Sequence, residues 1–183
     1  MLNALQERKL GHLFTLLDTD DDGVLDSTDF TAIADRLATS FGFAPDSAQA
    51  ARLRACYGHL WQGVMKPVDS DGDDRVSPAE YASGFGAHVA LPEDGYLRHL
   101  SAVADAFFDI LDGDSDGRIG ETEYVRAATN AFRMDEAAAQ AAFRRLDANG
   151  NGWLSREELH TATEQYFRSP DQTAPGNWMF GPL

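Results

Sequence analysis

The sequence of 183 residues contains a single cysteine, Cys56, and this excludes an internal disulfide framework. It contains no run of about 18 apolar residues, so no membrane-spanning helix is expected. The first ten residues carry no apolar signal core and Gly does not follow Met1, so neither secretion nor N-myristoylation is expected. These absences together predict a soluble cytoplasmic protein that has no membrane partner.

Basic residues are also scarce, with 15 against 30 acidic residues and a formal net charge of −15. Nucleic acid is therefore excluded as an expected partner, because binding it requires a basic face. The negative charge is concentrated rather than spread over the chain. Four segments of twelve residues, 18–29, 69–80, 112–123 and 147–158, hold 19 of the 30 acidic residues. Each segment is thus a focused anionic field that favours a cation.

The four segments share one pattern of oxygen-bearing residues. Each has Asp at position 1, Asp or Asn at positions 3 and 5, and a carboxylate at position 12. Ca²⁺ takes six to eight oxygen ligands, which a short loop supplies from positions 1, 3, 5 and 12, from the backbone carbonyl of position 7 and from position 9. The predicted ligands are Asp18, Asp20, Asp22, Val24, Asp26 and Asp29 in the first loop; Asp69, Asp71, Asp73, Arg75 and Glu80 in the second; Asp112, Asp114, Asp116, Arg118 and Glu123 in the third; and Asp147, Asn149, Asn151, Trp153 and Glu158 in the fourth.

Positions 6 and 8 of the loops predict the local backbone. Position 6 needs a positive φ, which suits Gly, and only the second loop lacks Gly there, with Asp74 in its place. Position 8 is apolar throughout, and it should join the first loop to the second and the third to the fourth by short antiparallel β-ribbons. The residues at position 8 are Leu25, Val76, Ile119 and Leu154.

The segments that flank the loops have the apolar period of amphipathic helices. The residues that lead into the third loop, for example, are Leu97, Leu100, Ala104, Phe107 and Leu111. The predicted fold is all-α, with eight helices that form four helix-loop-helix units in two pairs within one compact globule. We expect an N-terminal pair in residues 1–90, a C-terminal pair in 91–168 and a tail in 169–183.

Two loops depart from the pattern. Asp29 ends the first loop in place of Glu, and its shorter side chain favours six-coordination, so we expect Mg²⁺ to compete there. In the second loop Asp74 must adopt a positive φ, and Pro67 should end the entering helix near Met65. Pro78 is harmless if Ser77 is the N-cap. We therefore expect three or four bound Ca²⁺ ions, and the second loop is the one expected to be empty if any is.

These loop motifs resemble those of the EF-hand superfamily. The loops begin at residues 18, 69, 112 and 147, and the long first gap together with Asp29 resembles the sarcoplasmic calcium-binding proteins, above all the bacterial calerythrin-type members of actinomycetes. The resemblance implies a compact globule with a role in calcium buffering or transport. Members often have a second loop that binds no metal, but here that loop keeps all its carboxylates.

Two functions remain open from the sequence, a Ca²⁺ buffer and a Ca²⁺ sensor that exposes an apolar surface to regulate a partner. The four methionines form no cluster in the sequence, which favours the buffer, a monomer without an indicated protein target. The tail contains Trp178, Met179 and Phe180, and we predict that it folds back and fills the groove that a sensor keeps for its target. Cys56 and His59 are three residues apart, but Cys56 lies on an apolar helix face, so no enzyme is expected.

Overall fold

The computed structural model describes the backbone of residues 2–89 and 93–183, and the side chains of these residues except those of 88–89, 93–100 and 103. Eight α-helices lie in these ranges: α1 (Ala4–Leu17), α2 (Ser27–Ser40), α3 (Ala48–Leu60), α4 (Pro78–Val89), α5 (Glu93–Leu111), α6 (Glu121–Ala131), α7 (Glu136–Leu146) and α8 (Arg156–Arg168). The short elements are the π-helical turn η1 (Trp61–Met65), the 3₁₀ turns η2 (Lys66–Val68) and η3 (Pro175–Trp178), and the strands β1 (Ile119–Gly120) and β2 (Trp153–Leu154).

The helices that leave the four loops all begin at position 10, because the loop supplies their N-terminal caps. In α8, the hydroxyl of Ser155 accepts from the N–H of Glu158 at 3.1 Å, and the Glu158 carboxylate accepts from the N–H of Ser155 at 3.0 Å. This reciprocal pair satisfies two backbone donors that would otherwise lack partners at the helix start. Ser77 and Glu80 make the same exchange at α4, where Pro78 is the first helical residue, as predicted.

The entry into the second loop follows the sequence closely. The regular helix α3 ends at Leu60, and helical turns continue through η1 to Met65 before Pro67 enters the 3₁₀ turn η2. The helical geometry therefore changes where the proline predicted a break. Leu97 and Leu100, expected on the apolar face that leads into the third loop, lie outside the described side chains.

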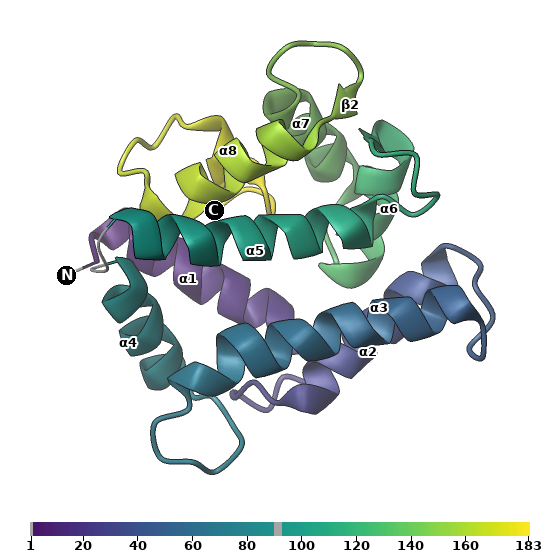
Figure 1. The fold of residues 1–183 in the computed structure, drawn as a ribbon. Helices are drawn as coiled ribbons and strands as arrows, with labels where there is room; N and C mark the ends of the chain where they lie inside the picture. The colour runs from purple at the N-terminus through teal and green to yellow at the C-terminus, as the bar shows by residue number, and fades with distance from the viewer. Residues whose placement is uncertain (1, 90–92) are drawn as a thin grey trace.

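The helices pack into one compact globule, which confirms the predicted all-α fold. Figure 1 shows α5 crossing the molecule, with α8 on one side and the antiparallel pair α2 and α3 on the other. The first helix, α1, packs against the last, α8: the hydroxyl of Tyr166 donates to the carbonyl of Lys9 at 2.7 Å, and Gln6 Nε2 donates to the carbonyl of Phe167 at 3.2 Å. The two ends of the sequence are thus joined in one core. Within the described residues, no helix has the length and apolar character needed to cross a membrane.

The predicted β-ribbons are present. Ile119 pairs with Leu154 in the antiparallel strands β1 and β2, and Leu25 pairs with Val76 in a single antiparallel bridge. All four side chains have an exposed fraction of 0%, so each ribbon is anchored in the core. The loops are consequently held in pairs, the first beside the second and the third beside the fourth.

Candidate metal sites

Three of the four loops bring carboxylate oxygens close together. The groups are Asp18, Asp20 and Asp22 in the first loop, Asp69, Asp71 and Asp73 in the second, and Asp112, Asp114 and Glu123 in the third. In each group one oxygen per residue lies within 4.8 Å of the others. The fourth loop has neutral Asn149 and Asn151 at the corresponding positions, so its acidic donors are Asp147 and Glu158.

The donor sets fit Ca²⁺. Two oxygens bound to one Ca²⁺ at about 2.5 Å are at most about 5 Å apart, and the spacing in these groups meets that limit. The donors are carboxylate oxygens, which a hard cation prefers over nitrogen or sulfur. Mutually repelling carboxylates at this separation are stabilised by a cation between them. A bound Ca²⁺ would supply that charge and hold each loop closed.

The loops are preorganised by backbone N–H groups that donate to the predicted ligands. The residue at position 1 spans the loop: Asp18 accepts from the N–H of Asp22 at 3.1 Å and from that of Gly23 at 3.0 Å. Asp112 and Asp147 make the same two contacts in the third and fourth loops. These hydrogen bonds orient the carboxylates of position 1 toward the centre of each loop.

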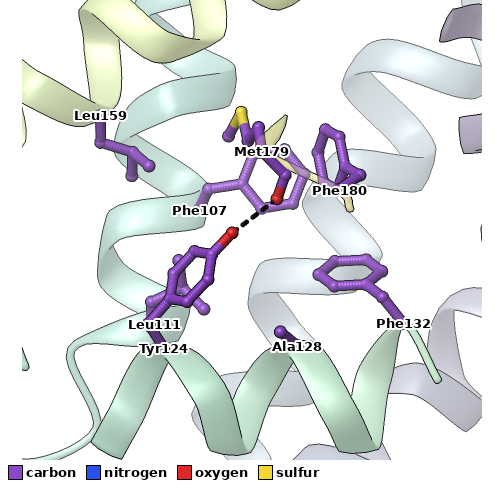
Figure 2. Close-up of a pocket in the computed structure, with 8 residues that line it drawn as sticks. All are labelled: Phe107, Leu111, Tyr124, Ala128, Phe132, Leu159, Met179 and Phe180. Carbon is purple, nitrogen blue, oxygen red and sulfur yellow. Dashed lines mark hydrogen bonds between the residues drawn. The ribbon is translucent and has the colours of Figure 1, made fainter. Parts of the chain in front are cut away.

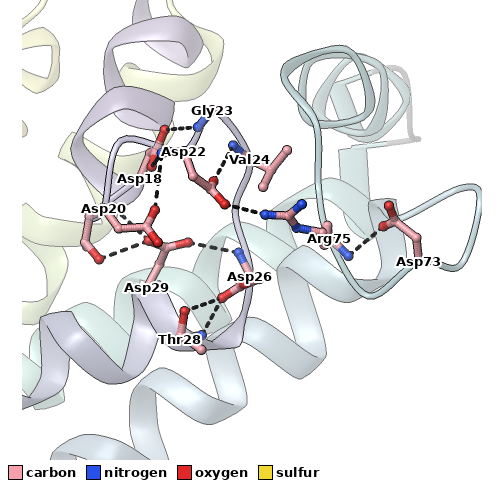
Figure 3. Close-up of polar contacts among 11 residues, drawn as sticks. Asp18, Asp20, Asp22, Gly23, Val24, Asp26, Thr28, Asp29, Asp73 and Arg75 are labelled. Atoms are coloured by element: carbon pink, nitrogen blue, oxygen red, sulfur yellow. Dashed lines mark hydrogen bonds and ion pairs between the residues drawn. The ribbon is translucent and has the colours of Figure 1, made fainter.

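Position 12 closes each loop from the other side. Glu123 accepts from the N–H of Gly113 on one oxygen and from the N–H of Gly120 on the other, both at 2.9 Å. The shorter Asp29 makes the equivalent contacts, with Thr19 N at 2.8 Å and Asp26 N at 2.9 Å (Figure 3). Asp29 therefore reaches both ends of its loop although it lacks one methylene.

The first loop is the most enclosed at its closing residue. Asp29 is 3% exposed, and burial raises the pKa of its carboxyl group. Asp26, predicted as a ligand at position 9, is not a member of the group formed by Asp18, Asp20 and Asp22. Its Oδ1 accepts from the backbone N–H and the hydroxyl of Thr28, at 2.7 and 2.6 Å, and so caps α2. Partial burial opposes ionisation of Asp26, but these hydrogen bonds outweigh it and lower the pKa.

The closing residue of the second loop, Glu80, is partly exposed and is held by serine residues. Glu80 accepts from the N–H and hydroxyl of Ser70 at 2.8 and 2.9 Å, and from those of Ser77 at 3.0 and 2.8 Å. These hydrogen bonds lower the pKa of Glu80 to about 2, so it is a carboxylate at neutral pH. Asp74 at position 6 has φ +64°, the left-handed conformation that its position required. The structure thus brings Asp69, Asp71 and Asp73 into one group and gives Asp74 the backbone that the loop needs, while the roles of Glu80 and the Arg75 carbonyl as ligands stay predictions.

Position 4 is a feature that the sequence analysis missed. Its backbone has a positive φ in every loop, at Asp21, Gly72, Ser115 and Gly150, with values of 59°, 78°, 62° and 70°. Gly at this position in two loops was the available signal. In the first and second loops, the residues on either side of this turn, at positions 3 and 5, belong to the same group of carboxylates. For a residue other than glycine, this left-handed backbone conformation costs about 1 kcal/mol.

Comparisons with known proteins agree with this geometry. A family model described as EF hand matches residues 103–127 and 139–161, and one described as EF-hand domain pair matches residues 1–36. Calerythrin of Saccharopolyspora erythraea is 28% identical over 91% of this chain and 94% of its own. The alpha chain of the sarcoplasmic calcium-binding protein of Penaeus vannamei is 26% identical over 92% of this chain and 90% of its own.

A solved structure is also similar over nearly the whole fold. It is a calcium-binding protein of Streptomyces coelicolor linked to prokaryotic calcium-mediated regulation, with 30% identity and a TM-score of 0.75, and the match covers 91% of this chain and 99% of that one. The loops, the fold and these relatives show calcium binding as the shared property, with Ca²⁺ as the ion. The chain therefore belongs to the EF-hand superfamily of calcium-binding proteins, and it is similar over nearly its whole length to bacterial calerythrin and to a sarcoplasmic calcium-binding protein.

Proposed function

We propose that this protein is a monomeric cytoplasmic Ca²⁺ buffer that binds one ion in each of its four loops through the predicted ligands. The observation that carries the proposal is the position of the tail. Met179 and Phe180 are 5% and 2% exposed, inside the apolar space between α5, α6 and α8 (Figure 2). The cavity left beside them measures about 10 Å³, too small for a target side chain. A sensor needs this space for its target helix.

The tail is held by specific contacts as well as by apolar burial. The carbonyl of Met179 accepts from the hydroxyl of Tyr124 at 2.9 Å, and the carbonyl of Phe180 is 2.9 Å from Nε2 of His12. The ring of Phe180 packs against Phe132 and Tyr166, with centroid separations of 5.3 and 5.0 Å. The tail thus occupies the site with partners from α1, α6 and α8 at once.

The turn η3 secures the tail before it enters the core. Gly176 donates from its N–H to Gln165 Oε1 at 2.8 Å and lies so near α8 that an added Cβ would be 2.3 Å from the carbonyl oxygen of Ala162. The guanidinium carbon of Arg145 lies 4.1 Å from the centroid of the Trp178 ring, a cation–π distance. These contacts support a tail that remains docked, which suits a buffer.

A dye titration distinguishes the buffer from a sensor. Ca²⁺ is added to metal-free protein while the binding of a hydrophobic dye is followed. Falling or constant dye fluorescence is expected for a buffer whose groove its own tail fills. Deletion of residues 170–183 should raise dye binding, whereas L183A should not, because Leu183 is already 39% exposed. A rise in dye fluorescence when Ca²⁺ binds the full chain would contradict the buffer.

A Ca²⁺ sensor is the second candidate. The observation that favours it is the Streptomyces coelicolor relative, which is linked to calcium-mediated regulation. A sensor would release Met179 and Phe180 when Ca²⁺ binds, and the same titration would then show rising fluorescence. An enzymatic role has less support: burial raises the pKa of the Cys56 thiol and keeps it in the less reactive protonated form.

A further inference from the structure

The side chain of Arg75 leaves the second loop and binds a predicted ligand of the first. Arg75 is at position 7 of its loop, and its Nη2 donates to Oδ2 of Asp22, at position 5 of the first loop (Figure 3). The bridge between Leu25 and Val76 aligns the two loops through hydrogen bonds of 2.9 and 2.8 Å. Because Arg75 directly precedes Val76, this bridge places its guanidinium beside the first loop.

Both oxygens of Asp22 are engaged. Oδ1 accepts from the N–H of Val24 at 3.0 Å, and Oδ2 is paired with Arg75. The position-5 carboxylates of the second and third loops, Asp73 and Asp116, each accept a backbone N–H at 2.8 Å on Oδ1. Within the described part of the chain, neither has an ion pair on its other oxygen. The first loop therefore differs from these two because one of its predicted ligands is paired with a guanidinium group.

The C-terminal pair provides an internal comparison. Arg118 stands at position 7 of the third loop, where Arg75 stands in the second. Its partner loop has neutral Asn151 at position 5, and the guanidinium carbon of Arg118 instead lies 4.7 Å from the ring centroid of Trp153. An arginine at position 7 thus binds across the ribbon to a carboxylate only where the partner loop offers one.

We propose that Arg75 sets the Ca²⁺ affinity of the first loop by competing with the ion for Asp22. The inference rests on the proposed ligand role of that loop. A divalent cation that enters must share Asp22 with the guanidinium or displace it, and the added positive charge weakens its attraction to the loop. Arg75 also couples the loops, because its N–H donates to Asp73 and its carbonyl is a predicted ligand of the second loop.

The test is a Ca²⁺ titration of the metal-free wild type and of the Arg75→Gln variant. The NMR resonances of the backbone amides of Gly23 and Gly117 report the binding of the ion. These two residues stand at position 6 of the first and third loops. Glutamine removes the charge but keeps the backbone carbonyl and N–H. In Arg75→Gln, the Ca²⁺ concentration at the midpoint of the Gly23 transition should be about three- to tenfold lower than in wild type at low salt. The midpoint at Gly117 should change much less. The gain should shrink near 0.15 M salt, where the Debye length is about 8 Å.

Two further variants separate charge from structure. Arg75→Lys keeps the charge and should leave the Gly23 midpoint near that of wild type. Arg54→Gln removes a positive charge from an ion pair with Asp35, at 2.7 Å, outside the loops, and it should not move the Gly23 midpoint. An equal gain in Arg54→Gln, or no gain in Arg75→Gln, would overturn the role of Arg75 alone.

The outcome for the loop itself is separate. If Gly23 responds to Ca²⁺ neither in wild type nor in Arg75→Gln, the proposed ligand role of the first loop fails, and the inference fails with it. If Gly23 responds only in Arg75→Gln, the competition by Arg75 is stronger than expected and the inference is supported.

Discussion

The hydroxyl of Tyr124 donates a hydrogen bond of 2.9 Å to the backbone carbonyl of Met179, so the tail is tied to the helix that leaves the third loop. Both residues are buried, with exposed fractions of 3% and 5%. Tyr124 follows Glu123, the predicted closing ligand of that loop. A movement of α6 when the loop binds metal would therefore act directly on the contact that holds the tail.

Tyr124→Phe should destabilise the Ca²⁺-loaded protein by about 1–2 kcal/mol, because the buried carbonyl of Met179 loses its donor. It should also increase hydrophobic dye binding. The measurement is urea unfolding at saturating Ca²⁺. Tyr81→Phe is the matched control: among the residues that the structure describes, the buried hydroxyl of Tyr81 has no hydrogen-bond partner, so its removal should be neutral or stabilising. Equal losses in the two variants would contradict a specific role for the Tyr124 hydrogen bond.

Gly176→Ala should destabilise the protein by about 1–3 kcal/mol through overpacking, because its Cβ would collide with the carbonyl of Ala162. Thermal unfolding of the Ca²⁺-loaded protein measures the loss. Gly11→Ala is the opposite case: it lies within α1, where an added Cβ meets no atom within 4 Å. The free energy of unfolding of that variant should be higher than that of wild type by up to about 1 kcal/mol, because alanine has a higher helix propensity than glycine. A neutral Gly176→Ala would show that the tail does not pack against α8 in solution.

Asp29→Glu should make the first loop prefer Ca²⁺ over Mg²⁺ by about tenfold more than wild type, since a longer carboxylate binds in a bidentate manner and favours higher coordination. Competition of Mg²⁺ with Ca²⁺ at the Gly23 resonance measures the change. The reciprocal variant, Glu123→Asp, should increase Mg²⁺ competition at Gly117 in the third loop. If both variants leave the competition unchanged, the residue at position 12 does not set selectivity in these loops.

The parts of the fold that the sequence predicted are those dictated by local spacing. Ligands at positions 1, 3, 5 and 12 require a turn at position 6, so the positive φ of Asp74 was predictable although it is not glycine. The same spacing places position 8 outside the turn, which gave the pairing of Leu25 with Val76. Asp21 and Ser115 at position 4 were missed, because neither residue type signals a left-handed backbone as Gly does.

Contacts between segments that are distant in the sequence could not be predicted from it. The apolar residues of the tail predicted that it is buried. Its partners His12, Phe107 and Tyr166 come from three different helices, and no local sequence pattern gives the arrangement of these helices. Arg75 and Asp22 are 53 residues apart in the sequence, so their pairing depends likewise on how the two loops are placed relative to each other. A regular motif predicts the groups that bind a cation, whereas tertiary packing decides which other charges approach them.

Buried Lys9 gives the stability of the protein an alkaline pH dependence. Lys9 is 1% exposed, and its Nζ donates to the carbonyls of Gln165 and Ser169 at 3.2 and 3.1 Å, beside the ring of Tyr166. Burial lowers the pKa of Lys9 from 10.5 to about 8. Between these values the unfolded chain holds more protons than the folded one, so the free energy of unfolding should rise with pH, by up to about 3 kcal/mol.

The measurement is urea unfolding of wild type and Lys9→Met at saturating Ca²⁺, from pH 7 to 10.5, the pKa of the unfolded group. The difference between the two proteins isolates Lys9 from the tyrosines, and it should change steadily in favour of wild type as the pH rises from about 8 to 10.5. Below pH 8 both folded and unfolded Lys9 are charged, so the difference should be constant there. Lys66→Met serves as control: Lys66 is exposed and paired with Asp74, which raises its pKa, so no such gain is expected. A constant difference for Lys9→Met across the whole range would mean that water reaches Lys9 in solution and that α1 packs less closely against the end of α8.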